Sequence, residues 1–231
     1  EKISKSDEKQ LREYACDAWK FFSQRVNKEE NHLPPDNIQF TPDERIAHRT
    51  SPTNIGLYLL SVCASCKLGI INEKEALSRI DNTLNTVILL PKWHGHLYNW
   101  YDLQTLSVLD GGFVSTVDSG NFVASLIAFC EGAKEYAGES PALLQVIASF
   151  SRIISETEFS ALYDRDRHLF SIGYSSAEGK FSESCYDTFM SEARTTSFLS
   201  VAFRQVPREH YFSPRRRVIG GLFHYGIASW S

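Results

Sequence analysis

Residues 93–121 read WHGHLYNWYDLQTLSVLDGGFVSTVDSGN, and the rest of the chain is arranged around them. These 29 residues hold two Trp, two Tyr, two His and three Asp, and an apolar segment follows directly. Long loops within compact domains are typically functional or disordered. The stretch therefore predicts a functional loop or, alternatively, an ordered loop whose aromatic rings close the end of a helical domain.

Outward from this stretch, the sequence shows three pairs of segments with helical periodicity. In each pair an amphipathic segment is followed, after a polar loop, by a nearly uncharged apolar segment, which predicts an outer and a buried inner helix. The amphipathic segments are 7–26, 72–90 and 141–158, and the apolar segments are 52–68, 122–136 and 187–204. Ser51 and Asp187 are candidate caps of two apolar helices, since both residue types favour that position.

The apolar helices are expected to start near Pro52, Ser119 and Asp187, which are 67 and 68 residues apart. A fixed period built from helix pairs is typical of a stacked helical array or a closed α/α toroid. The sequence therefore predicts an all-α fold, an (α/α)6 toroid-type array of which about three outer/inner helix pairs are present. Small β-hairpins are expected within 97–109 and 169–184, and 207–231 remain unassigned.

Three helix pairs make a partial barrel, which exposes inner-helix surface that further pairs would cover. We expect one of two explanations. Either the chain is part of a longer protein, as its ending within an apolar stretch at Trp230 and Ser231 indicates, or it forms a homodimer through this face.

In a toroid the inner helices point their N-termini to one end, so the three long loops meet there. Free N–H groups and a partial positive charge at that end favour oxygen-rich ligands. The loop composition suits a sugar, because aromatic faces stack on its CH groups while polar groups fix its orientation. The candidate substrate-binding residues are Trp93, Tyr98, Trp100, Tyr101, Asp102, Asp118, Asn121, Asn54, Asp187 and Arg194.

Glu192 is the candidate catalytic residue. It falls within the predicted apolar helix 187–204, where a partly desolvated carboxyl would have the raised pKa that a general acid requires. The alternative is a structural ion pair with Arg49, Arg194 or His48. Glycoside chemistry needs a second carboxyl group, and the candidates for that group are Asp102, Asp118 and Asp187.

Composition argues against several other functions. A net charge of −4 gives no sign of nucleic-acid binding, and the basic run 215–217 is expected to be a solvated loop. No Gly-rich phosphate loop, Walker sequence or nucleophile elbow is present, so no cofactor is expected. His94 and His96, spaced by one residue without a third ligand, are a weak metal motif, and no metal is expected.

The cysteines and the apolar runs bear on the compartment. The odd count of five cysteines predicts thiols in a reducing setting, and Cys63 and Cys66 are expected to be structural. The opening residues are charged, unlike a secretory signal. The longest nearly uncharged run, 55–64, is too short to span a bilayer, so a cytoplasmic segment without a membrane span is expected.

Several motifs together resemble the glycoamylase-like region of bacterial cyclic β-1,2-glucan synthases. The resemblance covers nearly the whole chain in the same order. The motifs are LPPDN (33–37), AHRTSPTNIGL (47–57), GHLYNWYD (95–102), VSTVDSGN (114–121), LFSIGY (169–174), YD (186–187), SEAR (191–194) and SWS (229–231).

This resemblance implies an (α/α)6 barrel that acts on β-1,2-glucan by anomer-retaining transglycosylation, closing a linear glucan into a ring. In such synthases the region lies between a membrane-embedded glycosyltransferase and a phosphorylase-like domain, so a cytoplasmic position at the inner membrane is implied. Glu192, in the matching Ser-Glu-Ala-Arg motif, is the implied acid/base, and Asp102, Asp118 and Asn121 are implied sugar contacts.

The same resemblance implies that residues 1–231 are one domain, truncated at its C-terminal end. The family pattern continues past Ser231 into helices with further glutamates, one of which is the expected nucleophile. The isolated segment is therefore expected to be inactive. The alternative function is a non-catalytic half barrel, either sugar-binding or purely structural, which lacks the full set of catalytic carboxylates.

Overall fold

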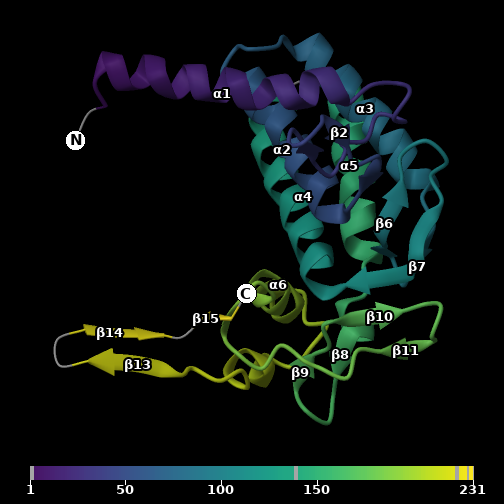
Figure 1. Ribbon diagram of the computed structural model, residues 1–231, viewed down its shortest axis with the longest axis vertical. Helices are drawn as coiled ribbons and strands as arrows, with labels where there is room; N and C mark the ends of the chain where they lie inside the picture. The colour runs from purple at the N-terminus through teal and green to yellow at the C-terminus, as the bar shows by residue number, and fades with distance from the viewer. Residues whose placement is uncertain (1–2, 138–139, 222–223, 228, 231) are drawn as a thin grey trace.

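The computed structural model describes residues 3–137, 140–221, 224–227 and 229–230 (Figure 1). Within these residues it has six α-helices, and the loops before α2, α4 and α6 carry most of the strands. The helices are α1 (Lys5–Arg25), α2 (Pro52–Lys67), α3 (Glu73–Leu89), α4 (Thr116–Ala137), α5 (Pro141–Glu156) and α6 (Arg194–Ala202). The predicted helices over 7–26, 52–68, 72–90 and 141–158 are confirmed to within a few residues.

The helix α4 is central, because it contacts α2 on one side and α6 on the other. Two glycines allow this close approach. A Cβ added at Gly56 would lie 2.7 Å from Ser125 Oγ of α4, and one added at Gly120 would collide with Thr196 of α6. The Thr196 hydroxyl also donates a 2.8 Å hydrogen bond to the Thr116 carbonyl, which joins the starts of α4 and α6.

Two hydrophobic clusters form the core. The larger one lies among α1 to α5, and the smaller one lies under the loops that lead to α6. The large side chains that are fully buried include Tyr58, Phe129, Phe150, Phe159 and Phe170.

The helix starts test the predicted caps. Ser51 caps α2, since its Oγ accepts the Asn54 N–H at 3.3 Å, so that prediction is confirmed. The helix α4 begins at Thr116, three residues before Ser119.

The prediction that Asp187 caps the third inner helix is wrong, because α6 begins seven residues later at Arg194. The intervening chain is extended instead. Its strand β12 (Met190–Ser191) pairs in parallel with β15 (Ser229–Trp230), so a contact almost 40 residues away replaces the expected helical turns.

The fold is mainly helical as predicted, but it is not purely α, because strands from three loops form one five-stranded sheet in the order β11-β10-β7-β6-β3. These strands are β3 (Arg49–Thr50), β6 (Asn99–Asp102), β7 (Val108–Ser115), β10 (Gly173–Ser175) and β11 (Lys180–Phe181). The predicted hairpins correspond to the antiparallel pairs β6–β7 and β10–β11. The sheet joins the three long loops at the end of the molecule where α2 and α4 begin.

Shorter elements complete the loops and the C-terminal part. They are β1 (Ile38–Gln39), β2 (Arg45–Ile46), β4 (Lys92–Trp93), β5 (His96–Leu97), β8 (Tyr163–Asp164), β9 (Leu169–Phe170), β13 (Val218–Gly221), β14 (His224–Ile227) and the 3-10 helices Phe159–Leu162 and Arg208–Phe212. The strands β13 and β14 pair as a hairpin that projects from the body (Figure 1). No helix of the described residues combines the length and the apolar character that crossing a membrane requires.

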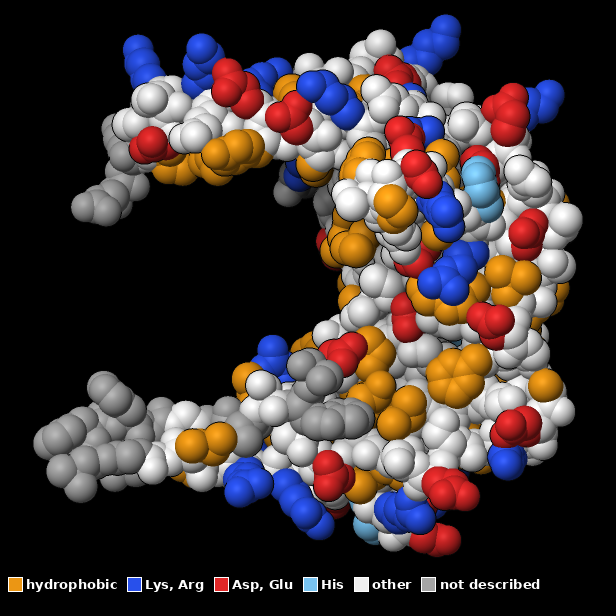
Figure 2. Space-filling view, viewed as in Figure 1, with side chains coloured by type: hydrophobic (Ala, Val, Ile, Leu, Met, Phe, Trp, Pro, Cys, Tyr) orange, Lys and Arg blue, Asp and Glu red, His pale blue; other side chains and the backbone are white. Residues whose placement is uncertain are grey.

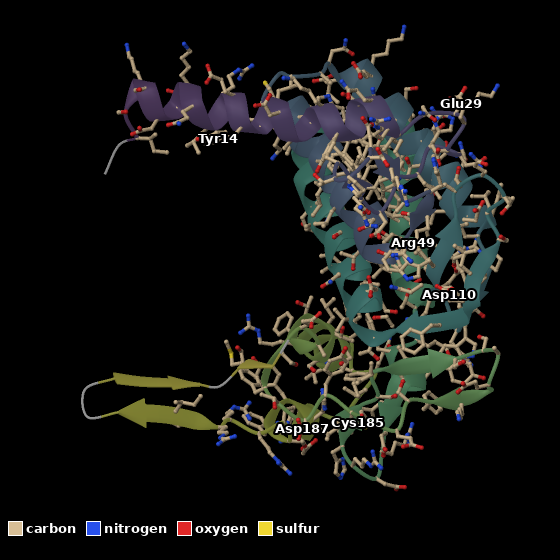
Figure 3. The ribbon with its side chains drawn as sticks, viewed as in Figure 1. Tyr14, Glu29, Arg49, Asp110, Cys185 and Asp187 are labelled. Carbon is tan, nitrogen blue, oxygen red and sulfur yellow. The ribbon has the colours of Figure 1, made fainter. Side chains whose placement is uncertain are left out.

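One side of the molecule is hollowed between α1 and β13 (Figure 2). Tyr14 lies on the side of α1 that faces this hollow (Figure 3), and it is 60% exposed. The row of α2, α4 and α6 also carries exposed apolar side chains, Leu57 on α2 and Phe198 on α6. We call the surface that carries the exposed side chains Tyr14, Leu57 and Phe198 the open face.

Candidate functional site

The first turns of α2 and α4 bring three polar side chains together. The Thr53 hydroxyl donates a 2.7 Å hydrogen bond to Oδ1 of Asp118, and the Asn121 amide donates to the same hydroxyl at 3.2 Å. All three side chains are half-buried. The structure therefore brings together Asp118 and Asn121, two of the predicted site residues, and adds Thr53 as the group between them.

A second polar group extends from the start of α2 to the five-stranded sheet. The Asn54 amide donates to Oδ1 of Asp36 at 3.2 Å, and the Arg49 guanidinium donates to Oδ2 at 3.2 and 3.4 Å. The guanidinium also lies 4.3 Å from the ring centre of Trp100, in a cation–π contact. Asp36 thus orients the predicted residue Asn54, and Arg49 lies against the predicted residue Trp100.

Asp36, Arg49 and Thr53 are not among the predicted substrate-binding residues. Each lies in a motif that resembled the synthase region, within 33–37 or 47–57, and this was the available signal. The sequence predicts Arg49 only as an alternative ion-pair partner of Glu192. It pairs with Asp36 instead, and His48 pairs with Glu30 at 2.6 Å.

Glu192 lies in the turn between β12 and α6, not within a helix. Its side chain is exposed, so the expected desolvation is wrong in this chain. The third proposed ion-pair partner, Arg194, is exposed at the start of α6 and donates to the Met190 sulfur at 3.1 Å.

Tyr186 connects Glu192 electrostatically to Asp118. Burial, together with the negative charges of Glu192 and Asp118, raises the pKa of the Tyr186 hydroxyl to about 12. Both carboxylates therefore act on one phenol, which remains protonated at neutral pH. A recess of about 10 Å³ is lined by Tyr186, Ser191 and Arg194, among others.

Asp187 lies apart from this group. It is exposed, its Oδ2 lies 3.8 Å from Arg215 Nη1, and its carbonyl accepts the Arg215 N–H at 2.7 Å. In Figure 3 it lies with Cys185 in the lower part of the molecule, away from Arg49. The structure therefore places Asp187 away from Arg49 and beside Arg215.

The Asp102 side chain stabilises the turn that follows strand β6. Its Oδ1 accepts hydrogen bonds from the Gln104 N–H, the Thr105 N–H and the Thr105 hydroxyl at 2.8–3.0 Å. The bonds from Thr105 are the main reason that the pKa of Asp102 lies below its usual value. Asp102 also pairs with Arg49 across strands β6 and β3, so its backbone borders the candidate site.

Three of the four predicted aromatic residues have different environments. Tyr101 is fully buried, and its hydroxyl donates to the Pro91 carbonyl at 2.6 Å and accepts the Tyr98 N–H at 2.9 Å, so its predicted contact with a ligand is wrong. The half-buried Trp93 stacks on Tyr174, with ring centres 4.3 Å apart. Trp100 is the aromatic residue that lies beside the polar group at the start of α2.

The two histidines of the weak metal motif, His94 and His96, both contact Glu158 in the loop after α5. His94 Nδ1 lies 2.8 Å from the Glu158 carboxylate, and His96 Nε2 lies 3.0 Å from the Glu158 carbonyl. Across the part of the chain that the structure describes, no three His, Cys, Asp or Glu side chains are grouped to hold a metal ion. The polar groups at the starts of α2 and α4 instead present amide, hydroxyl, carboxylate and guanidinium groups beside an aromatic face.

Comparison with known proteins shows which family the chain belongs to. The model of the family DUF3131, described as a protein of unknown function, matches residues 13–186, about three quarters of the chain. The chain belongs to the DUF3131 family. It is also 42% identical over 139 residues, 60% of this chain, to the cyclic β-(1,2)-glucan synthase NdvB of Rhizobium meliloti (strain 1021). The chain spans 5% of that protein's length, and the match confirms the resemblance seen in the sequence.

Solved structures show the same fold at low sequence identity. An endo-β-1,2-glucanase from Chitinophaga pinensis, in complex with sophorotriose and glucose, matches with a TM-score of 0.72 and 13% identity. The match covers 99% of this chain and 56% of the glucanase chain. An endo-β-1,2-glucanase from Talaromyces funiculosus, in complex with sophorose, matches with a TM-score of 0.69 and 13% identity, over 93% of this chain and 52% of the other. The chain thus spans about half of each fold.

Proposed function

We propose that this chain forms one wall of a site that binds and processes β-1,2-glucan. The observation that carries the proposal is the pair of polar groups at the starts of α2 and α4, with Trp100 beside them. Such placed hydrogen-bonding groups next to an aromatic face are suited to a sugar. The NdvB relative and the two glucanases, whose names refer to β-1,2-glucan, support this class of ligand.

The proposed reaction is anomer-retaining transglycosylation that closes a linear glucan into a ring. Glu192 protonates the oxygen of the glycosidic bond that breaks, so one part of the glucan leaves while a second carboxylate forms an ester with the anomeric carbon of the other part. Glu192 later accepts the proton of the hydroxyl group that attacks this carbon and releases the second carboxylate. When the attacking group is the 2-hydroxyl at the other end of the same glucan, the product is cyclic. When the attacking group belongs to water, the product is a shorter linear glucan.

We propose that Arg49 and Asn54 orient the glucan and that Trp100 stacks on a glucose ring. Asp118 and Asn121 contact neighbouring hydroxyl groups, with Thr53 fixing their positions. We assign these roles to these residues because their side chains lie at or near the surface, whereas Tyr101 is fully buried.

We propose that residues 1–231 belong to a single glycoamylase-like domain whose open face is covered by further helix pairs. The covering surface would supply the second catalytic carboxylate and would desolvate Glu192. Support comes from the exposed apolar side chains of the open face and from the fact that the chain spans about half of each glucanase chain. A second copy of the chain in that position, forming a homodimer, is the alternative arrangement.

The test replaces Glu192 by Gln in the full-length protein. Conversion of linear β-1,2-glucan would be followed by mass spectrometry, since a cyclic product is lighter by one water than the linear glucan of equal length. We expect the rate to fall at least 100-fold, in line with the usual contribution of general acid–base catalysis. A matched control is Glu178→Gln, another exposed glutamate, which pairs with Lys180 in the β10–β11 hairpin. Wild-type rates for Glu192→Gln would exclude the catalytic role.

The exposure of Glu192 favours a second candidate function, a sugar-binding module without catalysis. Calorimetry of this chain with β-1,2-glucooligosaccharides separates the two candidates when it is combined with the rate measurement. Heat of binding together with an unchanged rate for Glu192→Gln would support the binding module. Absence of heat would leave a structural role.

A further inference from the structure

A recess of about 710 Å³ opens between the turn that joins β8 to β9 and the chain that follows α6. It lies at the C-terminal end of α6, whereas Glu192 precedes the N-terminal end, and the nine residues of α6 span about 13 Å. The recess is therefore separate from the proposed glucan site. Its lining residues are Tyr163, Arg165, His168, Val201, Arg204, Gln205, Val206, Pro207 and Arg208.

The charged groups that line the recess are basic. Arg165, Arg204 and Arg208 are all exposed, and no Asp or Glu is among the described lining residues. Arginine keeps its charge at every physiological pH. Three positive charges from three separate segments therefore border one volume, and Tyr163 and His168 add a hydroxyl and an imidazole group.

The acidic side chains near the recess compensate only part of this charge. Glu209 lies 3.5 Å from Arg208. The Asp164 carboxylate pairs with Arg167, and Asp166 lies outside the lining. No ion pair among the described residues involves the other two arginines of the lining, so their guanidinium groups are available to a ligand.

Buried hydrogen bonds hold the walls of the recess in place. His210 is 1% exposed, its Nδ1 lies 2.9 Å from the His168 carbonyl, and its Nε2 lies 2.9 Å from the Ser197 hydroxyl. This ring joins the β8–β9 turn to α6. Gln205 donates a 2.9 Å hydrogen bond to the Thr157 carbonyl and so fixes the chain that follows α6. A ligand would therefore bind without the cost of ordering these segments.

The backbone at Arg204 also draws attention to this side chain. Arg204 follows Phe203, the C-cap of α6, and has a φ of +58°, in the left-handed region. Glycine or asparagine usually occupies this position after a helix, because other side chains are strained there. Strained positions of this kind gather at ligand sites. The end of α6 could be formed by glycine, so it does not by itself explain an arginine here.

We propose that this recess binds the phosphate group of a small organic phosphate. Guanidinium groups form paired, charge-assisted hydrogen bonds to phosphate oxygens. A phosphate monoester carries up to two negative charges and three free oxygens, enough for three arginines, whereas a carboxylate has one charge and two oxygens. The volume falls within the range of small-molecule sites, about 300–1,000 Å³, so it also admits an organic part, beside Val201 and Pro207. This site does not depend on the proposed glucan function.

The test measures which arginines a phosphate ester protects in the full-length protein. Phenylglyoxal modifies accessible arginines, and peptide mass spectrometry follows each one separately. We expect glucose 6-phosphate or adenosine 5′-monophosphate to slow the modification of Arg165 and Arg204 about tenfold at saturation. The exposed Arg45 of β2 should not be protected. The ester that protects at the lower concentration shows whether a sugar phosphate or a nucleotide is preferred.

Malonate, a dicarboxylate of equal charge, tests whether charge alone suffices. It should protect Arg165 and Arg204 severalfold less than the preferred ester at the same concentration. Absence of protection by both esters, or equal protection by malonate, would overturn the proposal.

The substitution Arg204→Gly separates binding from folding. Glycine suits the left-handed backbone at this position, so the variant should fold as the wild type does, which circular dichroism checks. Protection of Arg165 should then require about tenfold more ester, whereas Arg45→Gln should leave it unchanged. If Arg204→Gly fails to fold, Arg208→Gln replaces it in the same measurement. Wild-type protection of Arg165 in the folded variant would contradict the proposed site.

Discussion

The Thr53 hydroxyl donates a 2.7 Å hydrogen bond to the Asp118 carboxylate across the contact between the first turns of α2 and α4. The same hydroxyl accepts a hydrogen bond from the Asn121 amide, so replacing the hydroxyl with a methyl group removes both hydrogen bonds. We expect Thr53→Val to lower the free energy of unfolding by about 1–2 kcal/mol and to weaken binding of β-1,2-glucooligosaccharides. Urea denaturation and calorimetry measure the two effects. Thr53→Ser keeps the hydroxyl and should restore both, and a Val variant with wild-type affinity would contradict the proposed role of this contact.

Two glycines of α4 give opposite predictions for the same substitution. A Cβ at Gly120 would collide with Thr196, whereas a Cβ at Gly132 would meet the Cys63 sulfur at 3.8 Å, an ordinary contact. Gly120→Ala should therefore destabilise the fold by about 1–3 kcal/mol through overpacking. Gly132→Ala should stabilise it by about 0.5–1 kcal/mol, because alanine loses less backbone entropy in a helix. Thermal or urea denaturation checks both, and a stable Gly120→Ala variant would disprove the close approach of α4 and α6.

Substitutions at the neighbouring residues Trp100 and Tyr101 should have different effects, one on oligosaccharide binding and the other on stability. Tyr101→Phe removes two buried hydrogen bonds and should lower the free energy of unfolding by about 1–3 kcal/mol, with unchanged oligosaccharide affinity. Trp100→Ala should weaken oligosaccharide binding by about 1–3 kcal/mol, by analogy with other aromatic stacking platforms, with a smaller effect on stability. A matched control is Phe212→Ala, an exposed aromatic residue on the 3-10 helix Arg208–Phe212. Equal losses of affinity for the Tyr101 and Trp100 variants would contradict this division.

Local sequence patterns were sufficient for the elements that local interactions determine. The start of α2 followed from the capping residue Ser51, whose side chain accepts a backbone N–H group as expected. The hydrophobic patterns of the first five helices also predicted their type. The convergence of Asn54, Asp118 and Asn121 at one end followed from the repeated helix pairs, since equivalent helix starts point the same way.

Long-range pairing explains what the sequence could not show. Residues 187–191 are predicted to begin a helix, but Met190–Ser191 pair with Ser229–Trp230, and Glu192 therefore lies outside the helix. The five-stranded sheet likewise joins loops more than 50 residues apart. Tyr101 and Trp100 have similar aromatic character, so only the strand register reveals that one is buried and the other lies beside Arg49.

His96 makes the stability of the fold depend on pH. Its side chain is 1% exposed, Nε2 donates to the Glu158 carbonyl, and Nδ1 has no hydrogen-bond partner among the described residues. Burial lowers the pKa of His96 from 6.5 to about 4, since the charged ring would lose its hydration. Burial also lowers the pKa of His210, which therefore acts in the same direction.

Because the folded-state pKa of His96 lies below the unfolded-state value, the unfolded chain binds a proton first as the pH falls. The stabilising contribution is complete above about pH 6.5 and is lost as the pH falls from 6.5 to 4. Between pH 7.5 and 4.5 we expect this residue to lower the free energy of unfolding by about 2–3 kcal/mol. His96→Leu should be less stable at pH 7.5, since it lacks the hydrogen bond, but should lose correspondingly less stability at pH 4.5. Urea denaturation at both pH values measures this difference, and the exposed His94→Leu serves as the control. Parallel pH profiles for wild type and His96→Leu would show that another group causes the acid sensitivity.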